Sequence, residues 1–276
     1  MKDLTRRVLM ALWGIPLILL LSYLGGYFFL VLIVIINGLS LWEFYSIYQT
    51  QHYYAYRKMG VFLSTVLVLV SFYLSFELEL IAMVIVMILL LLRHLKISEP
   101  SSSLNTTLTI SGIFYITFFL TLLLQLRINL NSWIAPETTE NIAGKYFVLL
   151  WAAIWFCDTA AYFGGKYLGK HKLAPKTSPN KTIEGGISGF LGAVLVFGIL
   201  GSILIPTLNP IYFWISGIIV GIFGQLGDLV ESRFKRDAGV KDTSSLLPGH
   251  GGFFDRFDSL IFVSPFIFIL FYWIRI

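Results

Sequence analysis

Residues 27–48 read YFFLVLIVIINGLSLWEFYSIY, an apolar run that contains a single carboxylate, Glu43. A helix of about 20 such residues is long enough to cross the hydrocarbon core of a bilayer. The rest of the chain has the same character, because 57% of its 276 residues are hydrophobic and only 13% are charged. Soluble domains carry about 25% charged residues. The sequence therefore predicts an all-α, polytopic integral membrane protein.

About nine transmembrane helices can be drawn from the apolar periodicity. They cover residues 8–24, 27–48, 59–76, 78–92, 108–126, 146–163, 186–205, 211–229 and 259–273. The first span could be mistaken for a secretory signal. A second span begins directly after it, with no small-residue cleavage site between them, so we expect a retained helix.

The distribution of basic residues predicts the orientation. If the spans alternate in direction, 17 of the 20 lysines and arginines fall on one side, and only Arg127, Lys145 and Arg275 fall on the other. The basic side of a membrane protein is normally cytoplasmic. We therefore expect a cytoplasmic N-terminus and insertion in the cell's inner membrane. The positive charge follows the membrane surface, so no nucleic-acid partner is expected. The sole cysteine, Cys157, excludes an intrachain disulfide.

The informative polar residues are unevenly distributed along the chain. Residues 1–143 are predicted to form an N-terminal group of scaffold helices, in which Glu43 snorkels or makes an interhelical hydrogen bond, and residues 98–107 form a flexible linker. Residues 144–276 are predicted to form the catalytic region, with cytoplasmic loops at 164–185 and 230–258.

Four glycines, at 217, 221, 224 and 227, share one face of the eighth span. Such a face favours close helix packing and permits a homodimer. Asp228, Glu231 and Lys235 continue the same stripe. Since a carboxylate near the end of a span is costly unless it is paired or coordinated, Asp228 is predicted to be functional.

Two further aspartates, Asp255 and Asp258, stand at i and i+3 at the start of the last span. They could cap that helix and complement its dipole. Together with Asp228 they could instead supply the oxygen ligands that Mg²⁺ prefers. The glycine-rich turn before them contains His250, which contacts phosphate or packs in the turn.

A second polar segment follows the sixth span, which carries Asp158. Lys166, Lys170 and Lys172 are expected to contact anionic lipid headgroups. The run Ser178-Pro179-Asn180-Lys181-Thr182 immediately precedes a predicted helix. Hydroxyl, amide and ammonium groups at a helix N-terminus are suited to bind phosphate.

The order of these residues is similar to a known signature. The elements Ser232-Arg233-Phe234-Lys235-Arg236, Lys241-Asp242, Pro248-Gly249-His250-Gly251-Gly252-Phe253 and Asp255-Arg256-Phe257-Asp258 closely resemble the signature of phosphatidate cytidylyltransferases, also called CDP-diacylglycerol synthases. The segments 158–162 and 178–182 resemble motifs that precede it in that family. The resemblance covers residues 155–259.

This resemblance implies transfer of CMP from CTP to phosphatidic acid, with release of pyrophosphate. It implies Mg²⁺, with room for a second cation, on Asp228, Asp255 and Asp258. Lys235 is expected to join the catalytic residues, and Asp158 to orient a ligand. Phosphate groups would be bound by Ser178, Asn180, Lys181, Thr182, Arg233, Lys235, Arg236, Lys241 and His250.

Other functions remain open at this point. A CTP-dependent polyprenol or lipid kinase would share the nucleotide site but transfer the terminal phosphate. A CDP-alcohol phosphotransferase would require a longer aspartate-rich motif than the pair Asp255 and Asp258. A cation transporter would place charges near the membrane centre across several helices. Release of pyrophosphate from CTP separates cytidylyl transfer from the kinase and the transporter.

Overall fold

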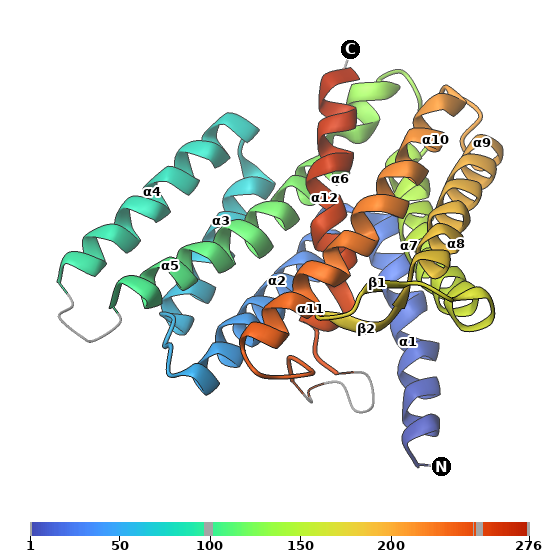
Figure 1. The fold of residues 1–276 in the computed structure, drawn as a ribbon. Helices are drawn as coiled ribbons and strands as arrows, with labels where there is room; N and C mark the ends of the chain where they lie inside the picture. The colour runs from blue at the N-terminus through green and yellow to red at the C-terminus, as the bar shows by residue number, and fades with distance from the viewer. Residues whose placement is uncertain (1, 97–101, 245, 247–250, 275–276) are drawn as a thin grey trace. The chain divides into compact units, whose positions relative to one another are not determined.

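The computed structural model describes residues 2–96, 102–244, 246 and 251–274, and Figure 1 traces its helices and its one small sheet. The helices are α1 (Lys2–Leu24), α2 (Gly26–Ile47), α3 (Arg57–Tyr73), α4 (Phe76–Leu95), α5 (Ser102–Gly112), α6 (Phe119–Ile134), α7 (Ile142–Leu168), α8 (Ile183–Leu195), α9 (Gly201–Leu204), α10 (Pro210–Ile219), α11 (Gln225–Asp237) and α12 (Phe254–Ile274). Short π-helical turns join α5 to α6, α8 to α9 and α10 to α11.

The all-α membrane class is confirmed. Within the part of the chain that the structure describes, seven helical segments are long and apolar enough to cross a bilayer. They are Gly26–Gln51, Phe76–Leu95, Ser102–Ile134, Ile142–Leu168, Ile183–Leu204, Pro210–Asp237 and Phe254–Ile274. The other two predicted spans correspond to α1, whose apolar part is Leu12–Leu24, and to α3, which has 17 residues. The predicted number of nine is therefore not confirmed.

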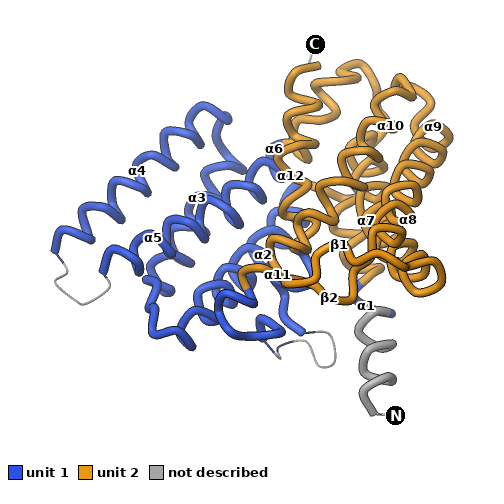
Figure 2. Tube along the Cα trace, in the orientation of Figure 1, with its two compact units in different colours: residues 1–14, 26–125, 235–257 blue, residues 15–25, 126–234, 258–276 orange. Residues whose placement is uncertain are grey.

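The chain divides into two compact units, which Figure 2 colours separately. Unit 1 comprises Met1–Gly14, Gly26–Gln125 and Lys235–Phe257, and unit 2 comprises Ile15–Gly25, Leu126–Phe234 and Asp258–Ile276. The predicted division at residue 143 did not anticipate that segments distant in sequence share a unit.

Unit 1 is held together by polar contacts between apolar helices. On α2, Asn37 donates to Ser64 Oγ of α3 over 3.0 Å. The Tyr45 hydroxyl donates to the Thr109 carbonyl of α5 over 2.7 Å. The Tyr45 ring fits there because Gly60 and Gly112 have no side chain, and a Cβ at Gly60 would lie 2.8 Å from it.

Unit 2 is built on glycine contacts. A Cβ at Gly189 of α8 would lie 2.9 Å from the Cys157 carbonyl of α7. The predicted glycine face is confirmed as a packing surface: a Cβ at Gly217 would lie 2.7 Å from Val194 Cα, and Gly221 lies against Phe190 of α8. Small residues let helix backbones approach closely in a membrane, so van der Waals contacts accumulate along these pairs.

Three local expectations need correction. Residues 102–107, predicted as part of a linker, begin α5, and Ser102, Asn105 and Thr106 are buried. The loop predicted at 164–185 contains the end of α7 and an antiparallel hairpin of β1 (Lys172–Ala174) and β2 (Ser178–Thr182). The loop predicted at 230–258 begins as helix, because α11 continues to Asp237. Residues 231–237 include five charged side chains, so the apolar pattern ends before them, but the segment is helical.

Candidate functional site

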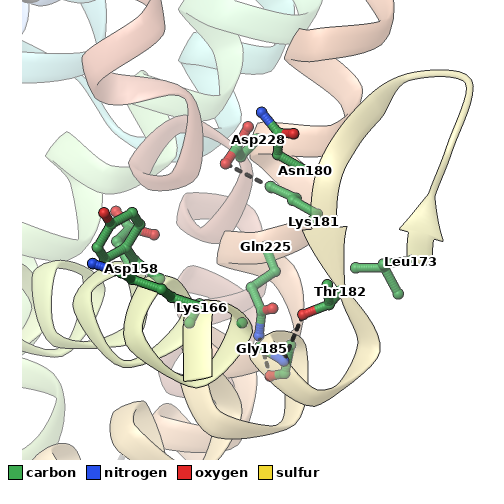
Figure 3. Close-up of a pocket in the computed structure, with 13 residues that line it drawn as sticks. Asp158, Lys166, Leu173, Asn180, Lys181, Thr182, Gly185, Gln225 and Asp228 are labelled. Atoms are coloured by element: carbon green, nitrogen blue, oxygen red, sulfur yellow. Dashed lines mark hydrogen bonds and ion pairs between the residues drawn. The ribbon is translucent and has the colours of Figure 1, made fainter. Parts of the chain in front are cut away.

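A cavity of about 460 Å³ in unit 2 collects several of the predicted residues. Figure 3 shows its polar lining, which comes from α7, β2, α8 and the first turn of α11. The lining side chains that can bind a ligand are Asp158, Tyr162, Lys166, Asn180, Lys181, Thr182, Gln225 and Asp228. The cavity therefore combines cationic, anionic and amide groups beside an apolar wall.

The hairpin positions the predicted phosphate-binding run. Strand β2 pairs with β1 in the register Lys172–Thr182 and Ala174–Ser178, and α8 begins immediately after it. Thr182 is the N-cap of α8, since its hydroxyl accepts a hydrogen bond from the Gly185 backbone N–H at 3.2 Å. Glu184, in the first turn of α8, pairs with His171 at 2.6 Å and so attaches the hairpin to that helix.

Lys181 and Asp228 form an ion pair across the cavity. The Lys181 Nζ lies 2.6 Å from Asp228 Oδ2, and both side chains are partly exposed, at 27% and 37%. Such a partly solvated pair contributes little to stability. Both groups remain accessible to a ligand that can compete for the lysine or the carboxylate.

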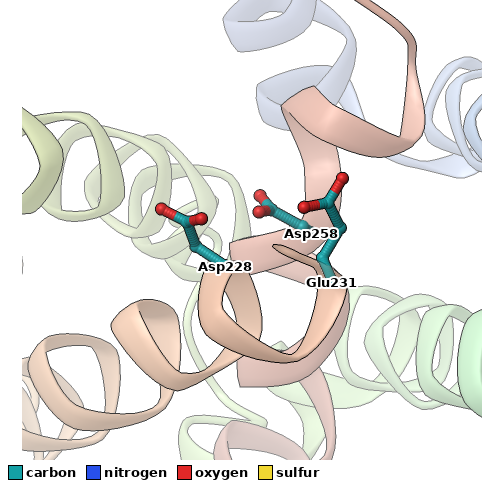
Figure 4. A group of neighbouring side chains, drawn as sticks. All are labelled: Asp228, Glu231 and Asp258. Atoms are coloured by element: carbon teal, nitrogen blue, oxygen red, sulfur yellow. The ribbon is translucent and has the colours of Figure 1, made fainter. Parts of the chain in front are cut away.

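Three carboxylates, of which Asp228 also lines the cavity, converge on one another, and Figure 4 draws their side chains. One oxygen from each of Asp228, Glu231 and Asp258 lies within 4.8 Å of the others. Glu231 and Asp258 are only 1% and 7% exposed. Like charges at this separation repel strongly in a medium less polar than water. An oxygen-ligated divalent cation suits the set, because Mg²⁺ binds through a few carboxylates together with waters or phosphates.

Close packing of α11 on α12 creates this convergence. A Cβ at Gly227 would lie 2.6 Å from Phe262 Cβ and 2.9 Å from the Asp258 carbonyl. The Ser259 hydroxyl donates to the Gly224 carbonyl over 3.0 Å and fastens the same two helices. Glycine at 227 therefore brings Asp228 and Glu231 of α11 beside Asp258 of α12.

Unit 1 contains the other predicted catalytic residues. Lys235 donates to Asp255 Oδ1 over 2.7 Å. The other carboxylate oxygen of Asp255 accepts from the Thr243 N–H, the Thr243 hydroxyl and the Gly252 N–H, at 3.1, 3.0 and 2.8 Å. Asp255 therefore closes the loop that runs from α11 to α12.

Glu43 of α2 closes the same loop from the other side. Its carboxylate is 3% exposed and accepts hydrogen bonds from the hydroxyls of Thr243 and Ser244 and from the backbone N–H groups of Phe253 and Phe254. A methyl group at Gly252 would collide with Glu43 Oε2 and Thr243 Oγ1. The interhelical hydrogen bond predicted for Glu43 is therefore confirmed, because Phe254 is the first residue of α12. The contacts with Thr243, Ser244 and Phe253 in addition link α2 to the loop between α11 and α12.

The remaining predicted residues are placed as follows. Arg233, Arg236 and Lys241 are exposed, and Arg236 donates to the Val240 carbonyl over 3.2 Å. Ser178 pairs with Ala174 and does not line the cavity. His250 lies outside the residues that the structure describes.

Sequence reasoning missed three residues at these sites. Glu231 shares the helix stripe of Asp228, so its spacing could have indicated a ligand. Gln225 precedes Asp228 by three residues on the same face, but its interest depends on helices distant in sequence. Glu43, the only carboxylate of its span, is expected from the sequence to snorkel or to make an interhelical hydrogen bond, but its contacts with the loop between α11 and α12 were not predicted.

The fold and these sites define an integral membrane protein in which a carboxylate cluster adjoins a cavity lined by lysine, aspartate and amide side chains. The family model described as "Cytidylyltransferase family" matches residues 5–274, and the chain belongs to this family. A protein of Bacillus subtilis named phosphatidate cytidylyltransferase is 32% identical over 270 residues, which is 98% of each chain.

Shorter matches are also found. A Staphylococcus epidermidis phosphatidate cytidylyltransferase is 48% identical over 132 residues, 48% of this chain and 51% of that protein. An Escherichia coli protein named "Uncharacterized protein YnbB" is 39% identical over 181 residues, 65% of this chain and 57% of its own. The chain thus spans about half the length of the staphylococcal relative that it matches.

Proposed function

We propose that this protein transfers CMP from CTP to phosphatidic acid, giving CDP-diacylglycerol and pyrophosphate. The observation that carries the proposal is that Asp228 belongs both to the carboxylate cluster and to the cavity that Lys166 and Lys181 line. Membership of the cytidylyltransferase family supports CTP as the nucleotide substrate, and the name of the B. subtilis relative supports phosphatidic acid as the lipid substrate.

The reaction joins two polyanions. An oxygen of the lipid phosphate attacks the α-phosphorus of CTP, an O–P bond forms, and the bond from this phosphorus to the bridging oxygen of the β-phosphate breaks. Pyrophosphate carries away the bonding electrons as the leaving group. Because the lipid phosphate is already an anion, the step requires positioning and charge neutralisation rather than a strong base.

Lys181 is suited to neutralise phosphate charge in this step. Its ammonium group lies at the cavity wall and pairs with Asp228 at 2.6 Å, so a phosphate can take over one of its hydrogen bonds. Asn180 and Thr182 flank it on β2 and line the same cavity. Charge-assisted hydrogen bonds of this kind are among the strongest that side chains make.

Asp228, Glu231 and Asp258 would hold Mg²⁺, because their oxygens converge within 4.8 Å. The bound ion would neutralise the phosphates and stabilise the attacking and leaving oxygens. Asp255 was predicted as a ligand, but its four hydrogen bonds within unit 1 support a role in holding the loop between α11 and α12. A second cation remains a prediction from the family resemblance.

We place the site at the cytoplasmic face of the inner membrane, since the basic residues favour that orientation. Homodimer formation remains a prediction. The glycine face that motivated it packs within the chain, through Gly217, Gly221 and Gly227.

The test is an assay in detergent with phosphatidic acid, Mg²⁺ and CTP labelled either at the α- or at the γ-phosphate. Cytidylyl transfer puts the α-label into lipid and releases the γ-label as pyrophosphate. A lipid carrying the γ-label would indicate a kinase instead. Absence of both labels from lipid, in protein that remains folded, would contradict the proposal. The Asp228→Asn variant provides the background rate.

A further inference from the structure

Gln225 stands in the cavity with its side-chain amide held in one orientation. Its Nε2 donates to the Gly186 carbonyl over 3.0 Å and to the Gly221 carbonyl over 2.6 Å. Both acceptors are carbonyl oxygens, so the group that faces them must be the NH₂. The other amide atom, Oε1, is therefore a hydrogen-bond acceptor and cannot exchange places with the nitrogen without losing two hydrogen bonds.

The local backbone makes this orientation possible. The π-helical turn Val220–Gly224 immediately precedes Gln225, and the Gln225 backbone N–H donates to the Ile222 carbonyl. In a regular α-helix that N–H would bond to the Gly221 carbonyl, four residues earlier. Here the side chain uses the Gly221 carbonyl instead, as occurs where a side chain enters the helical ladder.

The acceptor atom faces usable space. Gln225 is half-buried and lines the cavity, as Figure 3 shows. Gly186 lies beside it, and a Cβ there would be 3.3 Å from Oε1, so the absence of a side chain leaves room. Among residues 2–96, 102–244, 246 and 251–274, no group donates a hydrogen bond to this oxygen.

Its position relative to the phosphate-binding groups is also informative. Gln225 precedes Asp228 by three residues, about 4.5 Å along the helix axis. Asp228 pairs with Lys181, the proposed phosphate ligand. A nucleotide bound with its phosphates at Lys181 would therefore bring its nucleoside within range of Oε1. The cavity volume of about 460 Å³ is sufficient for that part of the ligand.

We propose that Gln225 is a specificity-determining residue whose Oε1 accepts a hydrogen bond from the 4-amino group of cytosine. The inference rests on the proposed function, because it assumes that the cavity binds CTP. It assigns a single atom to the choice between CTP and UTP.

The fixed orientation of the Gln225 side-chain amide is the reason that we assign its partner as the 4-amino group of cytosine. Cytosine carries an amino donor where uracil carries a carbonyl acceptor. A freely rotating glutamine could present its NH₂ to uracil and would not discriminate. The two carbonyls that hold Nε2 prevent this, so uracil would place one acceptor against another. A ribose hydroxyl both donates and accepts, and its recognition would not require a locked amide.

The main test compares kcat/KM for CTP, UTP and dCTP in the wild type and in Gln225→Leu. We expect the ratio of kcat/KM for CTP to kcat/KM for UTP to fall by about ten- to a hundredfold in the variant. Leucine at 225 removes both the favourable contact of Oε1 with the cytosine amine and its unfavourable contact with the uracil carbonyl. The CTP/dCTP ratio should stay unchanged.

The matched control is Ser216→Ala, on α10 of the same continuous helix. It removes another buried interhelical hydrogen bond, that of Ser216 Oγ with the Tyr146 hydroxyl at 2.7 Å. Loss of packing alone lowers the use of both nucleotides together, so this variant should keep the wild-type CTP/UTP ratio. An equal fall for CTP and UTP in Gln225→Leu would show only an interhelical link and would overturn the proposal. A selective change in the CTP/dCTP ratio would assign the contact to the ribose and would also overturn it.

A second measurement needs no variant. N4,N4-dimethyl-CTP lacks the amino hydrogens and carries two added methyl groups, whereas 5-methyl-CTP retains the amino hydrogens and carries one. We expect the wild-type protein to accept 5-methyl-CTP and to use the dimethyl analogue at least tenfold less well, on the order of one lost hydrogen bond. Equal use of both analogues would refute the role of Oε1. Failure of the wild type to convert CTP at all would refute the proposed function instead.

Discussion

Lys181 Nζ of β2 lies 2.6 Å from Asp228 Oδ2 of α11, so a residue predicted to bind phosphate and one predicted to bind a cation share an ion pair. A ligand that carries both phosphate and metal can replace this contact with one partner for each charge. The pair therefore links the hairpin to the carboxylate cluster before any substrate binds.

Replacing Lys181 by Ala should weaken the use of CTP. A charge-assisted hydrogen bond to phosphate contributes about 1.5–3 kcal/mol, so kcat/KM should fall about ten- to a hundredfold. The measurement is incorporation of α-labelled CTP into lipid. Lys172→Ala is the control, because Lys172 is exposed on β1 and does not line the cavity. Equal effects of the two substitutions would indicate that Lys181 acts only through general attraction to anionic lipid, and not by binding the phosphates of CTP.

Neutralising the carboxylate cluster should abolish turnover. Asp228→Asn, Glu231→Gln and Asp258→Asn each keep the side-chain shape but remove one anionic ligand from the group. We expect near-complete loss of activity in each, or a large increase in the Mg²⁺ concentration required. The measurement is activity across a Mg²⁺ titration in protein that is inserted and monodisperse.

The controls for the cluster are Asp237→Asn and Asp242→Asn, both on exposed side chains. They remove the same charge without touching the three converging carboxylates and should be mild. Normal turnover by Asp228→Asn and Asp258→Asn at every Mg²⁺ concentration would show that the cation site lies elsewhere.

Glu43→Ala should destabilise the loop between α11 and α12. The substitution leaves the Ser244 hydroxyl and the backbone N–H groups of Phe253 and Phe254 without their acceptor, while the Thr243 hydroxyl keeps Asp255 Oδ2 as its acceptor. Each buried donor left unsatisfied costs about 1–3 kcal/mol, so a loss of about 3 kcal/mol or more is expected. The measurements are the apparent Tm in detergent and the rate of proteolysis within residues 238–246.

A graded pair of variants makes the test of Glu43 specific. Glu43→Gln keeps one acceptor oxygen and should be intermediate between the wild type and Glu43→Ala. Glu137→Ala, on an exposed side chain, should leave the apparent Tm unchanged. If Glu43→Ala unfolded at the wild-type temperature, the four hydrogen bonds would not hold the loop.

Cysteine labelling tests the orientation. Lys176 and Lys241 are exposed, and the only native cysteine, Cys157, is buried, so background labelling should be low. Lys176→Cys and Lys241→Cys should resist an impermeant reagent added to intact cells, whereas Glu137→Cys should react with it. Reaction of Lys176→Cys or Lys241→Cys from outside would reverse the orientation.

The length of the apolar runs in the sequence was enough to predict most of the membrane-spanning helices. The predicted spans at 146–163 and 186–205 correspond to α7 and to the segment Ile183–Leu204, because a run of apolar residues must place its backbone hydrogen bonds within a helix in lipid. The glycines at 217, 221 and 227 also predicted close helix packing, because the three residues share one face of a single helix. The family signature likewise lies along one continuous stretch of chain.

The composition of the site depended on the tertiary structure. Glu231 joins Asp258 because Gly227 lets two helices approach, and Lys181 meets Asp228 because a hairpin lies between α7 and α8. Glu43 is 200 positions away in sequence from Thr243, which lies in the loop that Glu43 holds. The orientation of Gln225 requires a carbonyl on α8. Periodicity reports which residues share a face of one helix, whereas these contacts depend on how different helices pack.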